Sequence, residues 1–322
     1  MQIAIVGGAG FIGSNLASKL LEIGHSVTVF DNFSTGTREN LESLHVDVVE
    51  GDITSSKDIK YFFESNNFDF CYHLAALGSV PRSIVDPRSS FDANVIGTFN
   101  LLEQIRVKRI PLVYTSSSSV YGSNPKLPKE EMDWQIPISP YGGFKAANED
   151  MLQAYAQAYN LKIIIFRLFN VYGPHQNSQG AYSAVIPRWI SAALRGNSIE
   201  VEGDGEQKRD FTFVSDVAEV LKLATDIDIE VKGPINLAFG RPVTLNEILK
   251  ILSEVFQDLR VEFRDSRKGD IKNSESNPKK LYEVIGPYTP KSIKEGIAET
   301  ITWYKKNMET ESERNYEITT ED

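Results

Sequence analysis

The first 31 residues constrain the fold more than any other part of the chain. Residues 2–6, QIAIV, form an apolar, β-branched run that is typical of a strand buried on both faces. Three glycines follow at a regular spacing of three: Gly7, Gly10 and Gly13. Apolar residues then recur at helical intervals as far as Gly24, which predicts a helix that ends there. Residues 26–30, SVTVF, predict a second strand, and Asp31 closes it.

Each part of this pattern has a physical role in holding a dinucleotide. The first glycine permits a tight turn, the second lets the backbone approach a pyrophosphate, and the third lets the helix pack against the sheet. The helix N-terminus offers unpaired N–H groups and the positive end of its dipole to that pyrophosphate. Asp31 lies eighteen positions after Gly13, where its carboxylate can accept hydrogen bonds from both ribose hydroxyls and would repel a 2′-phosphate. The sequence therefore predicts a site for NAD rather than NADP.

Strand patterns continue to alternate with helical patterns along the first half of the chain. They occupy residues 46–54, 68–76 and 109–122. This alternation predicts an α/β fold with a parallel, doubly wound sheet, in which ligands lie at the carboxyl ends of the strands. A chain of 322 residues is long enough for such a domain and for a smaller one attached to it.

A row of four serines, residues 116–119, ends the last of these strands at the predicted ligand edge. A helical pattern follows Pro140 and places Tyr141 and Lys145 one turn apart on one face. The ordinary pKa of tyrosine is about 10, but a neighbouring ammonium and a positive nicotinamide ring would lower it. A serine hydroxyl can bind the substrate oxygen that the phenolate deprotonates. Tyr141, Lys145 and one hydroxyl from residues 116–118 therefore form a candidate acid–base set beside a hydride acceptor.

Over almost its whole length the chain resembles the extended short-chain dehydrogenases/reductases of the nucleotide-sugar 4-epimerase type, the UDP-glucose and UDP-N-acetylglucosamine 4-epimerases. The resemblance rests on GGAGFIGS, DNFSTG, GDIT, HLAALGSVPRS, NVIGT, SSSSVYG, SPYGGFK, FRLFNVYGP, AYSAVIPRWI, GDGEQKRDFTFVSDV and RKGDIKNS. Two features depart from the pattern. Val6 stands where relatives usually carry threonine, and Gly142 and Gly143 weaken the start of a helix. The resemblance implies a Rossmann-type sheet with a smaller C-terminal α/β substrate lobe.

The resemblance also implies an activity, the reversible 4-epimerisation of a UDP-hexose through a 4-keto intermediate. Ser117 would be the serine of the catalytic triad, and Ser118 a second contact with the substrate. Tyr141 would take the proton from the sugar 4-hydroxyl, while Lys145 would hold the nicotinamide ribose and keep Tyr141 acidic. NAD would be tightly bound and recycled in each turnover.

Further contacts are implied by the matched motifs. Those with NAD are Gly7, Gly10, Phe11, Ile12, Gly13, Asp31, Asn32, Ser34, Thr35, Gly36, Asp52, Ile53, Leu74, Ala75, Ala76, Ser116, Tyr141, Lys145 and Phe169. Those with the UDP-sugar are Ser79, Ser117, Ser118, Tyr141, Asn170, Gln176, Ala184, Val185, Arg209, Arg267, Asp270 and Ser274. Arg209 and Arg267 would clamp the diphosphate, because a guanidinium binds phosphate oxygens bidentately. Asp270 would accept hydrogen bonds from the nucleoside ribose.

The serine row also separates rival reactions. The related 4,6-dehydratases carry an Asp–Glu pair just before the VYG-like segment, and nucleotide-sugar decarboxylases keep a glutamate there. This chain has Ser118 and Ser119 instead, so it lacks a carboxylate for chemistry at C5, and 4-epimerisation is favoured. Two alternatives stay open: a 4-ketosugar reductase, which would consume external NADH, and a non-catalytic NAD-binding regulator, which usually loses the Tyr–Lys pair.

The substrate prediction depends on Ser274, at the position that gates the C2 substituent of the sugar in the similar enzymes. A small serine leaves room for an N-acetyl group. We therefore expect UDP-GlcNAc and UDP-GalNAc as substrates, with UDP-glucose and UDP-galactose also admitted. Alternatives are an enzyme confined to UDP-glucose or to UDP-glucuronate.

Residues 1–170 are expected to form the NAD-binding domain, with a return segment at 211–240. Residues 171–322 are expected to form mainly the UDP-sugar lobe, with a polar tail from about residue 307. The resemblance implies a homodimer. A net charge of −10 disfavours nucleic-acid and anionic membrane partners. No signal peptide or spanning segment is evident, so a cytoplasmic location is expected. The four scattered histidines show no metal-ligand spacing, so no metal is expected.

Overall fold

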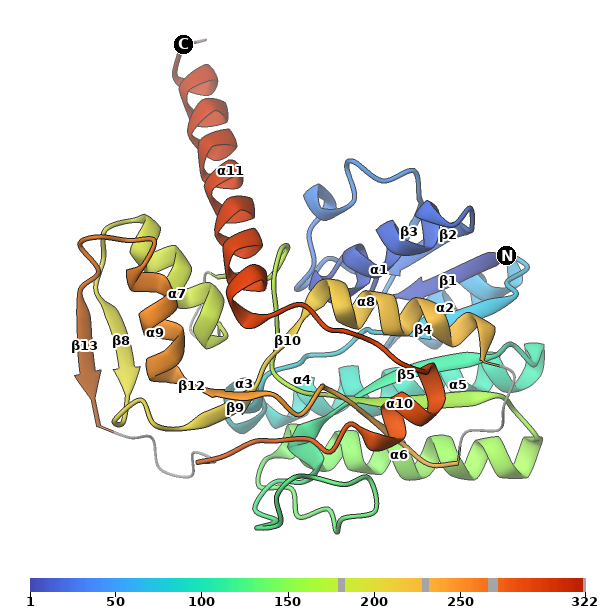
Figure 1. The fold of residues 1–322 in the computed structure, drawn as a ribbon. Helices are drawn as coiled ribbons and strands as arrows, with labels where there is room; N and C mark the ends of the chain where they lie inside the picture. Colours follow the sequence, from blue (N-terminus) through green and yellow to red (C-terminus); the bar gives the residue numbers. More distant parts are fainter. Residues whose placement is uncertain (179–182, 228–231, 266–271, 321–322) are drawn as a thin grey trace.

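The computed structural model describes residues 1–178, 183–227, 232–265 and 272–320, with side chains up to residue 308. A seven-stranded parallel sheet forms its centre, in the order β11-β6-β5-β4-β1-β2-β3 (Figure 1). Its strands are β1 (Gln2–Val6), β2 (Ser26–Asp31), β3 (Asp47–Glu50), β4 (Phe70–His73), β5 (Leu112–Ser117), β6 (Ile163–Leu168) and β11 (Ile235–Leu237). The central strand β1 is buried from Ile3 to Val6, because helices cover both faces of the sheet.

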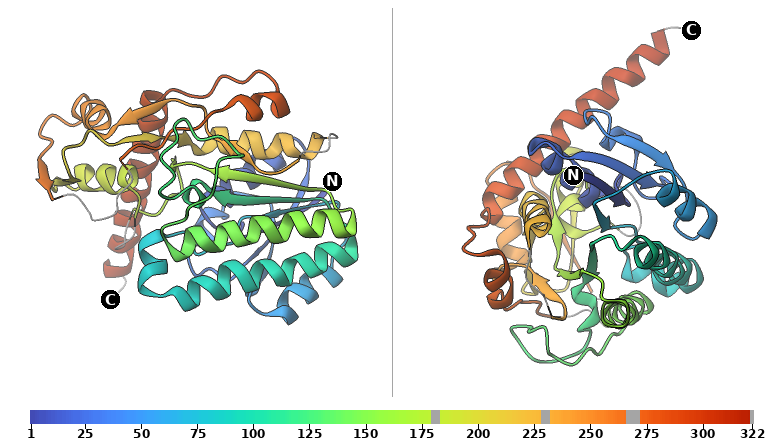
Figure 2. Two further views of the ribbon diagram at one scale, coloured as in Figure 1. Left: turned by 90° about the horizontal axis from the view of Figure 1, so that it is seen from below. Right: turned by 90° about the vertical axis from the view of Figure 1, so that its right-hand side faces the viewer.

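Two helical layers enclose this sheet (Figure 2). One layer holds α1 (Phe11–Glu22), α8 (Val214–Leu223) and α10 (Lys279–Ile285), and the other holds α2 (Ser56–Glu64), α5 (Gly97–Lys108) and α6 (Pro140–Tyr159). The short helices α3 (Val80–Val85) and α4 (Pro87–Phe91) lie against the N-terminal half of α6. Leu16 and Val217 belong to the core of the first layer, and Phe62 and Leu152 to that of the second. The predicted doubly wound, Rossmann-type fold is confirmed.

The chain returns to this sheet after leaving it. The first helix, α1, packs along α8, and β11 extends the sheet beside β6 with Ile235 opposite Phe166. Helix α8 and strand β11 both lie within the predicted return segment, 211–240. The numerical boundaries of the two predicted domains stay a prediction.

A smaller lobe has its own core around Trp189, Ile190 and Ile248. Its elements are β7 (Val171–Tyr172), α7 (Val185–Leu194), β8 (Ile199–Glu202), β9 (Lys208–Asp210), β10 (Thr212–Phe213), β12 (Pro242–Thr244), α9 (Leu245–Ser253), β13 (Val261–Arg264) and α11 (Ile293–Thr320). The strands form three two-stranded sheets, β7 with β10, β9 with β12 and β8 with β13. The lobe is therefore α/β, as predicted.

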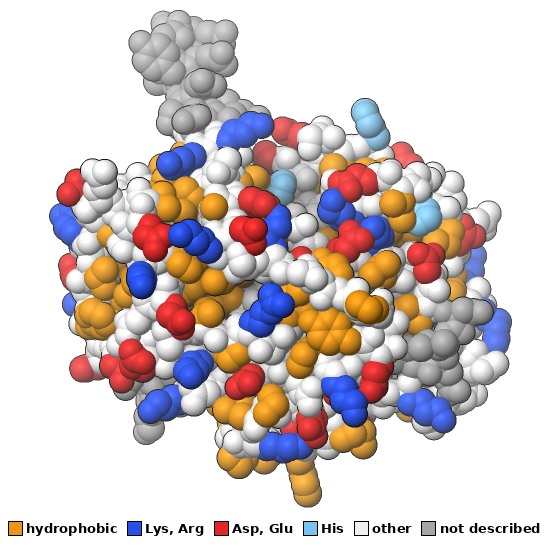
Figure 3. Space-filling model, viewed as in Figure 1, with side chains coloured by type: hydrophobic (Ala, Val, Ile, Leu, Met, Phe, Trp, Pro, Cys, Tyr) orange, Lys and Arg blue, Asp and Glu red, His pale blue; other side chains and the backbone are white. Residues whose placement is uncertain are grey.

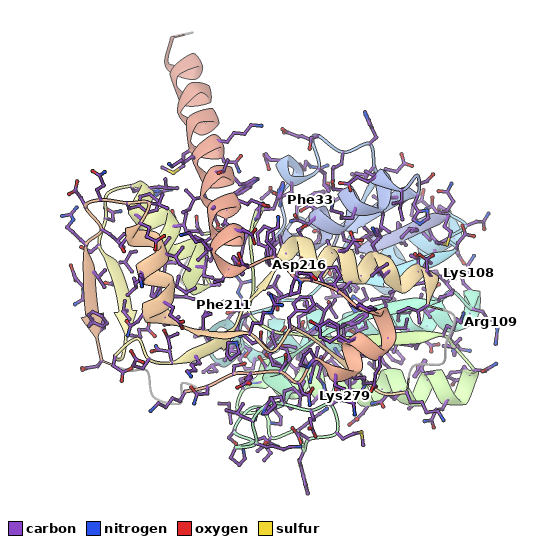
Figure 4. The ribbon with its side chains drawn as sticks, in the orientation of Figure 1. Phe33, Lys108, Arg109, Phe211, Asp216 and Lys279 are labelled. Atoms are coloured by element: carbon purple, nitrogen blue, oxygen red, sulfur yellow. The ribbon has the colours of Figure 1, made fainter. Side chains whose placement is uncertain are left out.

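The last helix, α11, begins in the smaller lobe and projects beyond the body of the molecule (Figures 1 and 2). Its first turns bury Ile297 and Ile301 in the core of that lobe. The segment before it is held by Asp216 of α8, labelled in Figure 4. The Asp216 carboxylate accepts hydrogen bonds from the Tyr288 hydroxyl at 2.7 Å and from the Lys291 backbone N–H at 3.1 Å.

Charged side chains of both signs are interspersed on the face shown in Figure 3. No helix within the described part of the chain has the length and apolar character needed to cross a bilayer. Among the described residues, no group of three or more His, Cys, Asp or Glu side chains is placed to hold a metal ion.

Candidate active site

The glycine turn after β1 is packed too tightly for side chains. Gly7 has φ +88°, and a Cβ there would lie 2.4 Å from the Ala75 backbone nitrogen. A Cβ on Gly13 would lie 2.4 Å from the Gly7 carbonyl oxygen. Helix α1 begins directly after Gly10, and no side chain caps its N-terminus. The first residues of the helix line the cavity described in the next paragraph. A bare helix N-terminus with close backbone access is suited to a pyrophosphate.

A cavity of about 700 Å³ opens at the carboxyl ends of the central strands. Nearly all of the predicted NAD contacts line it: Gly7, Gly10, Phe11, Ile12, Gly13, Asp31, Asn32, Ser34, Thr35, Asp52, Ile53, Leu74, Ala75, Ala76, Ser116, Tyr141, Lys145 and Phe169. Gly36 does not line the cavity. It packs behind the glycine turn, where a Cβ would lie 2.5 Å from the Ala9 carbonyl carbon.

Two carboxylates mark one end of the cavity. Asp31 accepts hydrogen bonds from the backbone N–H groups of Ala9 and Phe33, both at 2.9 Å. Burial raises the pKa of Asp31, although these bonds oppose the change. Burial acts the same way on Asp52, but hydrogen bonds from Thr54 and Asn32 outweigh it and lower the pKa of Asp52. Both side chains are therefore held in place as acceptors.

The predicted catalytic side chains meet where β5 faces the start of α6. Ser139 caps α6 by accepting a hydrogen bond from the Gly142 N–H at 3.1 Å. The Ser117 hydroxyl donates to Ser119 Oγ at 3.1 Å, and it is close enough to the Tyr141 side chain to act on the pKa of Tyr141. Lys145 is buried, and its Nζ donates to the Thr115 carbonyl oxygen at 2.7 Å. The sequence left residues 116–118 open by chemistry alone, and Ser117 is the member whose hydroxyl acts on the pKa of Tyr141.

Burial dominates the ionisation of this set. It raises the pKa of Tyr141 to about 12, although the bond with Ser117 acts in the opposite direction. Burial also lowers the pKa of Lys145 to about 7, against the effect of the Glu149 carboxylate. The lowering of the Tyr141 pKa expected from Lys145 is not found in the protein alone. Lys145 Nζ lies 5.9 Å from the centroid of the Tyr141 ring, and burial disfavours its own charge.

Only part of the predicted substrate set meets in the cavity. The members that line it are Ser117, Ser118, Tyr141, Asn170 and Gln176. The Gln176 side-chain N–H donates to the Val171 carbonyl oxygen at 3.1 Å. Its buried Oε1 has no hydrogen-bond partner among the described residues, so it can accept from a ligand. Ser79 caps α3 by accepting from the Arg82 backbone N–H at 3.2 Å. It lies between two cavity-lining residues, Gly78 and Val80.

Four other predicted substrate contacts lie in the smaller lobe and do not line the cavity. Ala184 and Val185 form the start of α7. Arg209, on β9, donates to the backbone carbonyls of Lys208 and Lys272. The Ser274 N–H donates to the Lys208 carbonyl oxygen at 3.0 Å, which places Ser274 beside Arg209. Two predicted contacts, Arg267 and Asp270, lie outside the described residues.

Several residues of the site were not predicted from the sequence. Cavity-lining residues that were not predicted include Thr54, Leu77, Gly78, Val80, Ser89, Asp92, Ala93, Thr115, Ser119 and Leu168. Most of them are next to predicted residues in the sequence. Their position at the carboxyl ends of the predicted strands was therefore the signal that could have identified them. Asp92 and Ala93 lie in a π-helical turn, residues 92–96, that no local pattern predicts. The buried pair Glu149–Arg167 was also missed.

The residues present fit a dinucleotide: a cradle that a Cβ would fill, a bare helix N-terminus, and carboxylates at the far end. With a Tyr–Lys pair at the same edge of a doubly wound sheet, they define a dinucleotide-dependent oxidoreductase scaffold.

Comparisons with known proteins narrow this class. The NAD dependent epimerase/dehydratase family matches residues 3–238. The UDP-glucose 4-epimerase of Mycolicibacterium smegmatis is 33% identical, over 96% of this chain and 100% of that protein. The structure of a UDP-N-acetylglucosamine 4-epimerase from Methanobrevibacter ruminantium, in complex with UDP-N-acetylmuramic acid, has a TM-score of 0.89 and 35% identity, over 95% of this chain and 98% of that one. A UDP-glucose 4-epimerase from Thermotoga maritima with UDP-glucose has a TM-score of 0.91 and 34% identity, over 96% and 100%. The chain belongs to the NAD dependent epimerase/dehydratase family and is an NAD-dependent enzyme.

Proposed function

We propose that this enzyme is a UDP-sugar 4-epimerase whose preferred substrates are UDP-GlcNAc and UDP-GalNAc. UDP-glucose and UDP-galactose form a second, smaller-substituent pair. The observation that carries the reaction is that Ser117, Tyr141 and Lys145 line one cavity together, with serines rather than carboxylates at 118 and 119.

The site residues have separate tasks in this reaction. When bound, NAD supplies the hydride acceptor and donor for C4 of the sugar. Tyr141 removes the proton of the 4-hydroxyl and returns it when the sugar is reduced from its other face. Ser117 holds the same oxygen by a hydrogen bond, and Lys145 supplies the positive charge that stabilises the phenolate. Because the pKa of Tyr141 is raised to about 12 in the protein alone, this arrangement needs the positive charge of the bound cofactor as well.

The choice of reaction within the family depends on what the serine row lacks. A dehydratase or a decarboxylase needs a carboxyl group close to C5 of the sugar. Ser118 and Ser119 line the cavity at the corresponding position, and neither can exchange a proton with carbon. The alternative reaction on this scaffold is that of a 4-ketosugar reductase, which would consume external NADH in proportion to product.

The substrate proposal rests on Ser274. Its small side chain would leave space at the C2 substituent of the sugar. The two solved relatives do not separate the possibilities, since they are similar to this chain to almost the same degree. The alternatives are an enzyme confined to UDP-glucose or to UDP-glucuronate.

We also propose that the enzyme acts as a cytoplasmic homodimer that pairs through α5 and α6. Exposed apolar side chains on and before α5 support this: Phe91, Ile96, Phe99 and Val107. Light scattering during size-exclusion chromatography would test it, and a monomer at micromolar concentration would contradict it.

The function is tested by incubating the purified protein, without added cofactor, with UDP-GlcNAc and UDP-glucose in separate reactions. The nucleotide sugars are then resolved by chromatography. UDP-GalNAc from UDP-GlcNAc is the expected result. UDP-galactose alone would keep the reaction and overturn the role of Ser274. No product in either reaction, even with NAD added, would overturn 4-epimerisation of these sugars and direct the search to a uronate.

A further inference from the structure

Side chains spaced four residues apart on helix α6 contact the end of strand β5. Tyr141, Lys145 and Glu149 share one face of the helix. Lys145 Nζ donates to the Thr115 carbonyl oxygen at 2.7 Å. Glu149 Oε1 accepts from the Ser116 hydroxyl at 2.5 Å. Two successive turns of α6 therefore bind two neighbouring residues at the end of β5, Thr115 and Ser116.

Glu149 is one half of a fully buried ion pair. Glu149 is 0% exposed and Arg167 is 2% exposed. Arg167 Nε donates to Glu149 Oε1 at 3.0 Å, and its Nη2 donates to Oε2 at 2.7 Å. Gln135 donates to the same carboxylate at 2.8 Å. Arg167 lies on β6, directly opposite Ser116 in the register of the sheet, so the pair sits immediately behind the serine row.

Among the groups around Lys145, the Glu149 carboxylate is the negative charge that raises the pKa of Lys145. The Tyr114 ring centroid lies 4.6 Å from Lys145 Nζ, and burial raises the pKa of Tyr114 well above its usual value. Burial lowers the pKa of the nearby His73 to about 3, so its imidazole is neutral at neutral pH. Tyr141, with a pKa of about 12, is neutral too. Glu149 is the group whose charge opposes the loss of the Lys145 proton.

Neither Glu149 nor Arg167 lines the cavity, so neither touches substrate or cofactor. A pair of residues that only held the fold together would not need to be charged. Buried ion pairs are often no more stabilising than well-packed neutral residues of similar volume. A carboxylate placed one helical turn from a buried lysine favours the charged form of that lysine, which a neutral residue would not do.

We propose that Glu149, held in place by Arg167, is a positioning residue for the catalytic set: its carboxylate favours the protonated form of Lys145 and fixes the end of β5 through Ser116. The inference rests on the proposed function, since that function gives the charge of Lys145 its role. Arg167 orients the carboxylate and supplies the countercharge that makes its burial tolerable.

Three variants separate charge from fold. Glu149→Gln with Arg167→Gln removes both charges and keeps amides that can hydrogen-bond each other. Glu149→Asp keeps the negative charge on a shorter side chain. The matched control, Glu254→Gln with Lys294→Gln, removes an ion pair of 2.7 Å from the surface of the smaller lobe. Each is prepared as the NAD-loaded protein, and its fold is checked by circular dichroism and thermal melting.

The direct readout is the titration of Lys145 by NMR in protein labelled at lysine side-chain carbons, with its signal identified by loss in Lys145→Met. The Glu149→Gln/Arg167→Gln variant should lower the titration midpoint by about half a pH unit or more. Glu149→Asp and the surface control should titrate close to the unsubstituted enzyme.

The pH dependence of activity should shift in the same direction as the titration midpoint of Lys145. Activity that needs protonated Lys145 is lost as pH rises through its pKa, so the high-pH limb of kcat should move to lower pH in the neutral pair variant alone. An unmoved midpoint in the folded variant would overturn the proposal, as would a variant recovered only unfolded, since the pair would then serve the fold. If the unsubstituted enzyme turns over no UDP-sugar, the proposed function fails, while the NMR titration still decides this inference.

Discussion

Single residues at the cavity edge are held in the protonation states that burial favours. The Tyr141 hydroxyl and the Lys145 ammonium are both shifted toward their neutral forms, with pKa values of about 12 and about 7. Charge brought by the cofactor therefore has a large effect on the pair. An enzyme arranged this way gains its phenolate only when the cofactor is present.

The first prediction concerns Tyr141. Tyr141→Phe removes the hydroxyl that exchanges the proton and should lower the epimerisation rate about 10²–10⁴-fold. NAD content and melting temperature should change little, because the ring that packs beside Lys145 is kept. Initial rates and cofactor release after denaturation measure both effects. Tyr61→Phe, at a tyrosine that is 65% exposed, is the control. Turnover of Tyr141→Phe within tenfold of the parent enzyme would contradict the assignment.

The second prediction concerns the stability that Lys145 removes from the NAD-free protein. Its pKa of about 7 in the folded state lies below the ordinary value of 10.5. Between these values the unfolded chain binds more protons, so this lysine makes the free energy of unfolding rise with pH, by at most roughly 1.4 kcal/mol per pH unit. Lys145→Met should therefore be stabilised relative to the parent most at pH 7 and least at pH 10. Urea unfolding across this range tests it, and parallel pH curves would refute it.

At the scale of an element, the start of α6 shows how one helix tolerates two glycines. Ser139 caps it and Pro140 occupies its first turn. A Cβ on Gly142 would lie 2.6 Å from the Ser119 carbonyl oxygen, whereas a Cβ on Gly143 would meet nothing within 4 Å. Gly142 is therefore required by the close approach of the serine row, and Gly143 is not required by packing.

The third prediction follows from this difference. Gly143→Ala should stabilise the protein by about 0.5–1 kcal/mol, because alanine loses less backbone entropy in a helix. Gly142→Ala should destabilise it and lower activity, since the serine row or the helix would have to move. Denaturant midpoints of the two variants give the comparison. Equal effects of the same sign would show that the contact at Ser119 does not matter.

Local sequence patterns predicted the elements that depend on local interactions. The strand–turn–helix unit from Gln2 to Asp31 and the start of α6 at Pro140 are both present. The partners of Gly142 and Glu149 were not predictable in the same way. Each contacts a residue of another element, and no spacing within α6 reveals which one.

At the scale of the whole molecule, one short segment joins the NAD site to the smaller lobe. Pro174 accepts a hydrogen bond from the Asn15 side chain of α1 at 3.1 Å. The His175 ring bonds Asn40, which follows β2, at 2.9 Å, and its centroid lies 5.1 Å from that of Trp303 on α11. Residues 174–175 are therefore held by both parts of the molecule.

The relative placement of the two lobes was not predictable from the sequence. Arg209 and Ser274 were predicted as substrate contacts by their motifs. Arg209 lies on β9 and Ser274 beside it, and neither lines the cavity. Motif spacing assigns such residues to a lobe but does not fix how far that lobe stands from the sheet. Their roles stay predictions.

The last prediction uses the joining segment. Gln176, which lines the cavity, follows His175 directly, and its carbonyl accepts a hydrogen bond from the Tyr304 hydroxyl of α11. His175→Asn tolerates the positive φ of 69° but loses the ring packed on Trp303. The KM for the UDP-sugar should rise about three- to tenfold, which corresponds to roughly 1 kcal/mol of lost positioning. NAD content should be unchanged, because the glycine turn keeps its own contacts. Steady-state kinetics beside cofactor content measure this, with the exposed His45→Asn as control. A variant that loses NAD while keeping its KM would mean that His175 supports the cofactor site rather than the position of Gln176.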